Sequence, residues 1–157
     1  MMKSKRKRKT TTLLYCEGDT EEVCAEYLKS LWLKSIDIEN WHWGSPLSII
    51  QKAINNSEGY DKIFVWIDTD RLEIEEALML AWNQNIEVIC NSPDFETEIL
   101  RILRPNIKVK NASKRKYTEL YPNDSLLKER TYKRFSKKIL WTISKDSPFN
   151  KLKDILL

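Results

Sequence analysis

The stretch DKIFVWID, residues 61–68, constrains the fold of this chain more than any other segment. Its five central residues, 63–67, are all apolar. A strand with one solvated face would alternate polar and apolar residues, whereas a nearly continuous apolar run is typical of a strand buried on both faces. Such strands belong to parallel sheets that are covered by helices on each side. The run therefore predicts a central parallel strand.

The remaining apolar periodicity predicts that strands and helices alternate along the chain. Further strands are predicted at residues 11–17, 36–43 and 86–90. Amphipathic helices are predicted at residues 20–35, 46–57, 73–84 and 94–103. Strands that alternate with helices in this way form a parallel sheet with right-handed crossovers. We therefore expect an α/β fold, a Rossmann-like and mostly parallel sheet of about four strands flanked by helices.

Charge divides the 157 residues into three parts. Residues 1–9 carry six Lys or Arg and no acid, and are expected to form a flexible basic arm. Residues 10–157 are expected to form a single domain, with an α/β core at 10–103 and a basic, mostly helical extension at 104–157. The core has eighteen acidic against six basic residues, and the extension has fifteen basic against five acidic residues. This polarity suits acids that bind a cation and ends that meet a polyanion, or simple attraction between the two halves.

Composition excludes several classes of protein. No apolar run approaches the roughly 18 residues of a membrane span, and the charged N-terminus lacks the apolar stretch of a signal peptide. Three widely spaced cysteines suit reduced thiols in a cytoplasmic protein. With His42 as the one histidine, a zinc site would lack ligands, so a metal would have to be a hard cation held by oxygen.

Carboxylates stand at the predicted carboxyl ends of three strands. Glu17 closes the first strand, Asp68 closes the third with Asp70 two residues later, and Glu96 follows the fourth. Ligands of open α/β sheets bind at these strand ends. Several carboxylates that meet there repel one another unless a cation neutralises them, and Mg²⁺ prefers such oxygen ligands. The pattern therefore predicts a magnesium site at this edge of the sheet.

Helix initiation explains some of the neighbouring acids without any ligand. Carboxylates cap helices and are favourable near the positive helix N-terminus. The acids explained in this way are Asp19, Glu21, Glu22, Asp70 and Asp94. Glu17 and Asp68 have no such explanation, and Gly18 allows the chain to turn sharply beside whatever binds there.

Three stretches also resemble the motifs of known nucleic-acid enzymes. Glu17-Gly18 after one strand and Asp68-Thr69-Asp70 after a later one are similar to the Toprim signature of topoisomerases, bacterial primases and overcoming-lysogenisation-defect nucleases. More closely, the chain resembles the RloB-like family of small proteins found beside restriction and phage-resistance genes. That resemblance extends over residues 11–157 and rests on residues 17–21, 64–71, 91–96 and 147–152.

The resemblance implies hydrolysis of phosphodiester bonds in DNA or RNA, dependent on Mg²⁺ or Mn²⁺, in phage defence or at a restriction-associated locus. It places Glu17, Asp68 and Asp70 at the metal as catalytic groups, and Glu96 could complete a second metal site. A basic group should stabilise the transition-state charge, and Lys116 is assigned this role together with its neighbours. Residues assigned to substrate binding are Gly18, Asn91, Ser92, Lys114, Arg115 and Lys116.

Two other functions stay open at this point. A non-catalytic nucleic-acid-binding accessory subunit of a defence complex would keep the acidic strand ends and bind through the basic tail. A phospho-receiver or small-ligand α/β domain would use the same acids but have no affinity for nucleic acid. The sequence is also compatible with a homo-oligomer and with a partner protein encoded nearby.

Overall fold

The computed structural model describes residues 11–32, 35–42, 44–109, 113–141 and 145–156. The predicted basic arm at 1–9 lies outside these ranges.

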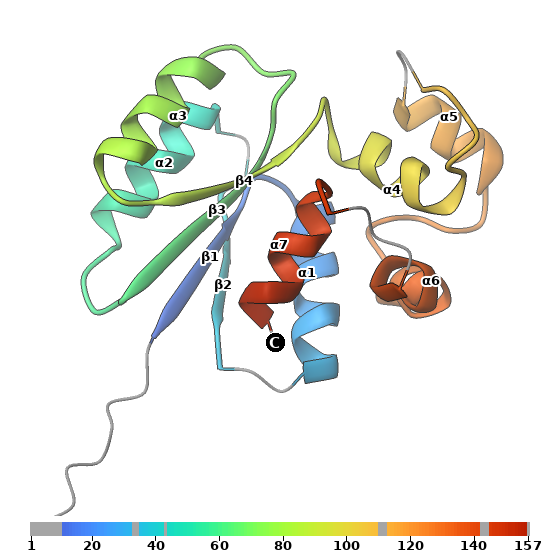
Figure 1. Ribbon diagram of the computed structural model, residues 1–157, viewed down its shortest axis with the longest axis horizontal. Helices are drawn as coiled ribbons and strands as arrows, with labels where there is room; N and C mark the ends of the chain where they lie inside the picture. The colour runs from blue at the N-terminus through green and yellow to red at the C-terminus, as the bar shows by residue number, and fades with distance from the viewer. Residues whose placement is uncertain (1–10, 33–34, 43, 110–112, 142–144, 157) are drawn as a thin grey trace, which may run out of the picture.

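The described residues form one four-stranded, all-parallel sheet with the strand order β2-β1-β3-β4 (Figure 1). The strands are β1 (Thr12–Cys16), β2 (Asp37–Asn40), β3 (Lys62–Asp68) and β4 (Glu87–Asn91). This arrangement confirms the predicted fold class, a Rossmann-like parallel sheet flanked by helices.

Helices cover both faces of the sheet. Figure 1 shows α2 and α3 on one side, and α1, α7 and the other helices on the opposite side. The helices in the described ranges are α1 (Asp19–Trp32), α2 (Pro46–Asn55), α3 (Ile74–Asn83), α4 (Phe95–Leu103), α5 (Ser113–Leu120), α6 (Glu129–Trp141) and α7 (Pro148–Leu156). None of them is long and apolar enough to span a membrane.

The two-sided cover explains why β3 is apolar throughout. Successive side chains of a strand point to opposite faces. Ile63, Val65 and Ile67 accordingly pack in the core beneath α2 and α3, while Phe64 and Trp66 pack in the core beneath α1, α4 and α7. Each face of this central strand is therefore buried in its own hydrophobic core.

The basic extension packs onto the second of these cores. Tyr132 of α6 is fully buried, and its hydroxyl lies 3.0 Å from the carbonyl oxygen of Thr20 at the start of α1. Phe149 of α7 contacts Trp66 of β3 edge to face, with ring centroids 5.6 Å apart. The extension thus helps to position the N-terminal end of α1, which follows directly after β1.

Three local predictions are wrong in detail. Asp19 is the first residue of α1 and not its cap. The cap of α3 is Glu73, in a left-handed conformation with φ of 64° and no side-chain cap bond, so Asp70 does not cap this helix. β2 spans Asp37–Asn40 and is therefore shorter than the predicted strand at 36–43, and the indole nitrogen of Trp41 donates to Ser48 of α2. The cap of α4 is confirmed, since Asp94 accepts a hydrogen bond from the backbone of Thr97 at 2.8 Å.

Candidate functional site

The sheet brings Glu17 and Asp68 together because β1 and β3 are neighbours. In the sheet, β2 lies on one side of β1 and β3 lies on the other. The connections from β1 to β2 and from β2 to β3 therefore run in opposite directions, which opens a crevice where β1 and β3 end. The backbone nitrogen of Glu17 donates to the carbonyl oxygen of Trp66 at 3.0 Å. The backbone nitrogen of Asp68 donates to Glu17 Oε2 at 2.8 Å. The two predicted residues are therefore in direct contact.

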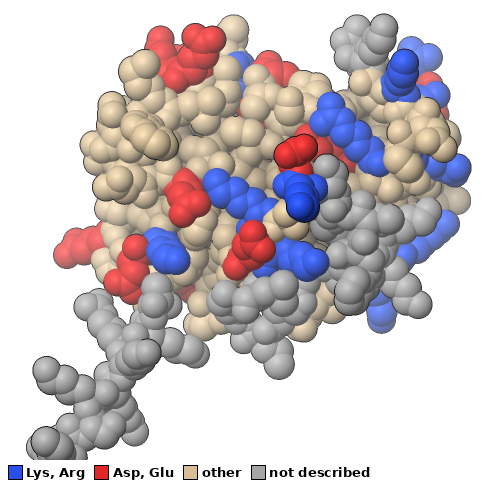
Figure 2. All heavy atoms as spheres, in the orientation of Figure 1, with Lys and Arg blue, Asp and Glu red and all other residues tan. Residues whose placement is uncertain are grey.

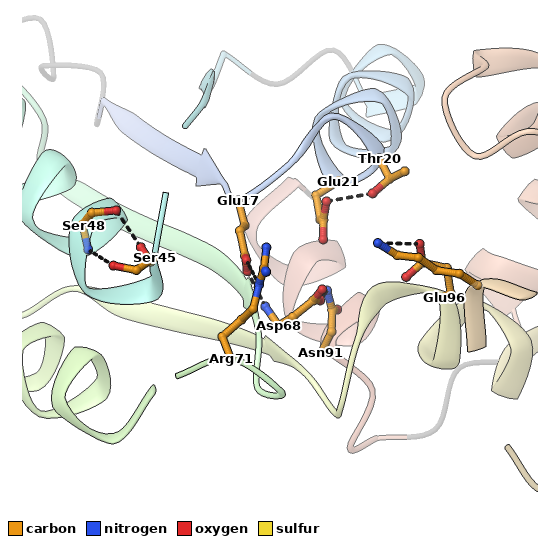
Figure 3. Close-up of polar contacts among 10 residues, drawn as sticks. Glu17, Thr20, Glu21, Ser45, Ser48, Asp68, Arg71, Asn91 and Glu96 are labelled. Atoms are coloured by element: carbon orange, nitrogen blue, oxygen red, sulfur yellow. Dashed lines mark hydrogen bonds and ion pairs between the residues drawn. The ribbon is translucent and has the colours of Figure 1, made fainter. Parts of the chain in front are cut away.

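An open pocket of about 230 Å³ lies over these strand ends. Figure 3 shows Glu17 and Asp68 on one side of this region, Glu96 on the other, and Glu21 between them. Five carboxylates thus line one pocket, since Asp19 also lies at its wall. The residues that line it are Glu17, Gly18, Asp19, Thr20, Glu21, His42, Gly44, Asp68, Arg71, Glu96, Lys114 and Leu127.

Asp68 is held in place by a buried amide. Asn91 at the end of β4 is fully buried; it donates to Asp68 Oδ1 at 2.9 Å and accepts from the indole of Trp66 at 2.8 Å. Burial, followed by the negative charge of Glu21, raises the pKa of Asp68 to about 8. Asn91 was predicted to contact substrate, but it does not line the pocket, and its contacts give it the role of orienting Asp68.

Glu21 is the site residue that sequence reasoning missed. Its side chain is only 4% exposed, and one carboxylate oxygen accepts a hydrogen bond from the hydroxyl of Thr20 at 2.9 Å. Burial is the main reason why its pKa rises to about 7, and the charges of Glu17 and Glu96 act in the same direction. A signal was present, because Glu21 shares the apolar face of α1 with Cys24 and precedes it by three residues.

Gly18 provides space for this carboxylate. A Cβ atom at Gly18 would lie 3.2 Å from Oε2 of Glu21, closer than an ordinary van der Waals contact. In the described chain the one glycine with positive φ is Gly59, so Gly18 does not serve through a left-handed turn. The predicted importance of Gly18 therefore rests on close approach by Glu21.

Basic side chains pair with two of the carboxylates in the pocket, Glu17 and Glu96. Arg71, in the loop between β3 and α3, donates from Nε to Glu17 Oε1 at 2.7 Å. Lys114 at the start of α5 places Nζ 3.9 Å from Glu96 Oε1. Burial raises the pKa of Glu96, and the charge of Lys114 opposes that rise. The pocket therefore holds cationic groups as well as carboxylates.

The other predicted site residues lie outside the pocket. Asp70 is exposed, and its charge still acts on Arg71 and Glu96. The backbone of Ser92 bonds to the side chains of Glu98 and Arg101. Besides Asn91, the predicted site residues that do not line the pocket are Asp70, Ser92, Arg115 and Lys116.

Arg115 and Lys116 differ from Lys114 although all three are adjacent in sequence. Arg115 is paired with Glu119 at 2.9 Å on the exposed side of α5. Lys116 is half-buried and does not line the pocket. The helical geometry of α5 therefore directs one member of the predicted basic group, Lys114, to the carboxylates.

The donor atoms of the pocket suit a hard divalent cation. Carboxylate oxygens are the ligands that Mg²⁺ and Mn²⁺ prefer, and desolvated carboxylates with raised pKa values gain most from a neutralising ion. Within the described ranges, however, no three Asp, Glu, His or Cys side chains are close enough to form a metal-binding group. Glu17 in particular already has both oxygens engaged, one by the Asp68 backbone and one by Arg71.

Fold and site together define a Rossmann-like α/β protein with an acidic pocket at the carboxyl ends of its two central strands. No family model, curated protein or solved structure matches this chain. Membership of the RloB-like family and the presence of a Toprim domain therefore stay predictions.

Proposed function

We propose that this protein hydrolyses phosphodiester bonds in nucleic acid with the help of a divalent cation, Mg²⁺ or Mn²⁺. The observation that supports it best is the single pocket in which Glu17, Glu21, Asp68 and Glu96 meet at the strand ends. Burial is the main cause of the raised pKa values of Glu21 and Asp68, and the charges of the neighbouring carboxylates add to it. A cation in the pocket would neutralise these charges.

Asp68, Glu21 and Glu17 are the residues that would hold the cation, with Glu96 further along the pocket. Glu21 takes the place that we first assigned to Asp70. A cation at this position supplies Lewis-acid polarisation of a phosphoryl oxygen. Asn91 keeps Asp68 oriented through its hydrogen bond to Oδ1. An ion bound at the other carboxylate oxygen would leave this hydrogen bond intact.

Two cationic side chains could bind the phosphate group itself. Arg71 and Lys114 line the pocket, and their side chains are 54% and 81% exposed. An exposed Lys or Arg can reach a phosphate oxygen and stabilise the charge that develops during hydrolysis. Lys114 therefore replaces Lys116 as the proposed partner of the transition state.

The surface beside the pocket suits a polyanion. Figure 2 shows Lys and Arg side chains gathered over the part of the visible face that belongs to α5 and α6. Contacts between such residues and phosphates supply most of the sequence-independent affinity for nucleic acid. The exposed basic residues of α5, α6 and the segment between them include Lys114, Arg115, Lys128, Arg130, Lys133 and Arg134.

The direct experiment incubates the purified chain with single- and double-stranded DNA and RNA in Mg²⁺, Mn²⁺ or EDTA. We expect cleavage with either metal, none in EDTA, and a loss of at least about 100-fold in Asp68→Asn and Glu21→Gln. Glu26→Gln is the matched control, because Glu26 lies on the same helix, is exposed and does not line the pocket. Cleavage that persists in EDTA, or that Asp68→Asn leaves unchanged, would refute the proposal.

One observation favours a second function, a non-catalytic nucleic-acid-binding subunit. Glu17 is bonded to Arg71, and the described residues contain no assembled metal-binding group. This alternative predicts salt-dependent binding of DNA or RNA that is equally strong in EDTA and is not followed by cleavage. The resemblance to RloB-like proteins is the reason to place either function in phage defence, with a neighbouring protein as partner.

A further inference from the structure

Glu17 and Arg71 form the tightest ion pair of the pocket. Glu17 is 6% exposed, and Arg71 reaches it from a loop whose next residue, Leu72, is 88% exposed. One oxygen of Glu17 accepts from the backbone of Asp68 and the other from Arg71 Nε. The carboxylate that accepts from the Asp68 backbone is thus already paired with a positively charged side chain of the protein itself.

A guanidinium and a divalent cation cannot both use the same oxygen of Glu17. A cation would approach a carboxylate oxygen to about 2.0–2.1 Å, close to the position that Arg71 occupies, and the two positive charges would repel each other. Metal binding by Glu17 therefore requires Arg71 to move away. The exposed loop and the half-exposed side chain of Arg71 leave room for this movement.

A phosphate group would give Arg71 an alternative partner. Guanidinium groups bind phosphate through two parallel hydrogen bonds, and the bond to Glu17 uses only Nε. Arg71 lines the same open pocket that a nucleic-acid phosphate would enter. We propose that Arg71 blocks Glu17 until a phosphate in the pocket binds Arg71, so that the divalent cation and the nucleic acid bind cooperatively.

This inference rests on the proposed metal-dependent function, and it adds that the free protein is held in a state of low metal affinity. The cation would bind Glu17 and the phosphate would bind Arg71, so each ligand breaks the same ion pair and their binding is coupled in both directions. Nucleic acid must therefore increase affinity for the metal, and the metal must increase affinity for nucleic acid by the same factor. An ion pair that only stabilises the loop would predict no gain in Mn²⁺ affinity when Arg71 is removed.

The experiment measures Mn²⁺ binding to the full chain by titration calorimetry, with and without a short oligonucleotide carrying non-hydrolysable phosphorothioate linkages. An uncharged methylphosphonate oligonucleotide of the same sequence is the ligand control. We expect the charged ligand to strengthen Mn²⁺ binding to the wild type by about 10-fold, and the uncharged one to leave it unchanged. In Arg71→Ala, Mn²⁺ should bind about 10-fold more tightly without any ligand, and the added effect of the oligonucleotide should fall to what direct contact between the ion and a phosphate oxygen provides.

Arg101→Ala is a closely matched control variant. Arg101 is 52% exposed and bonds Glu98, which is 7% exposed, at 2.8 Å, while Arg71 and Glu17 are 54% and 6% exposed at 2.7 Å. The Arg101 pair lies outside the pocket. Its loss should leave Mn²⁺ affinity within about two-fold of the wild type.

Arg71→Gln is measured as well, because it keeps a neutral donor beside Glu17 if Arg71→Ala folds poorly. The double variant Glu17→Gln/Arg71→Ala should lose the gain in Mn²⁺ affinity, since the gain acts through Glu17. If the wild type binds and cleaves but Arg71→Ala and Arg71→Gln bind Mn²⁺ no more tightly, the competition is refuted while the proposed function stands. If no variant binds Mn²⁺, the proposed function fails and the competition fails with it.

Discussion

The charge of Asp68 should make the protein less stable as pH rises from 5 to 7, which is opposite to the usual effect of a paired carboxylate. Burial and the charge of Glu21 raise the pKa of Asp68 in the folded protein to about 8, against an ordinary value of 3.8. Between these two values the folded state holds a proton that the unfolded chain releases. The free energy of unfolding therefore decreases with rising pH throughout this window.

The size of the effect follows from the width of the window. One pH unit inside it changes the free energy of unfolding by about 1.4 kcal/mol. The interval from pH 5 to pH 7 lies wholly between the two pKa values, so Asp68 contributes about 2 to 3 kcal/mol. The pKa of Glu21 is raised from 4.5 to about 7, so Glu21 also lowers the free energy of unfolding as the pH rises between these two values.

Asp68→Asn isolates this contribution. Asparagine keeps the oxygen that accepts from Asn91 and cannot ionise, so the variant should gain about 2 to 3 kcal/mol relative to the wild type between pH 5 and pH 7. Urea unfolding at several pH values in EDTA measures the difference, and Glu26→Gln is the control. A difference between Asp68→Asn and the wild type that stays constant over this interval would show that Asp68 is not desolvated as the structure indicates.

Three further substitutions test the construction of the pocket. Gly18→Ala should force the Glu21 carboxylate to move by a few tenths of an ångström and weaken Mn²⁺ binding, as calorimetry would detect, with unfolding in EDTA as the measure of any structural effect. Asn91→Leu leaves the buried indole of Trp66 and the partly buried carboxyl of Asp68 without their partner and should cost about 2 to 3 kcal/mol in urea unfolding. Lys114→Ala should reduce cleavage at least about 10-fold, whereas Arg115→Ala, which removes a residue paired on the outer side of α5, should not.

The apolar pattern was sufficient to predict the sheet and the positions of Glu17 and Asp68. Ile63, Val65 and Ile67 alternate with Phe64 and Trp66 between two cores, and only a strand covered on both faces can bury all five. A parallel strand that ends in a carboxylate presents it at the carboxyl edge of the sheet, whichever helices surround it.

The Asp-x-Asp spacing predicts that Asp70 shares a cation with Asp68, and the structure places Asp70 outside the pocket. Two residues along a strand would place Asp70 on the same face as Asp68, but β3 ends at Asp68. The backbone nitrogens of Thr69 and Asp70 both donate to the carbonyl oxygen of Pro93, in the loop after β4. That contact between distant parts of the chain turns Asp70 out of the strand direction, and no local pattern encodes it.

The pattern of apolar and acidic residues was enough to predict four parallel strands, the strand-end acids Glu17 and Asp68, and the hard-oxygen chemistry that they offer. Which other side chains join them depends on packing between distant segments, because α1, the β3–α3 loop and α5 meet over the same strand ends. Docking buries Glu21 in the pocket, brings Arg71 onto Glu17, and brings Lys114 close to Glu96. Periodicity describes each element separately, whereas these contacts depend on where the elements meet.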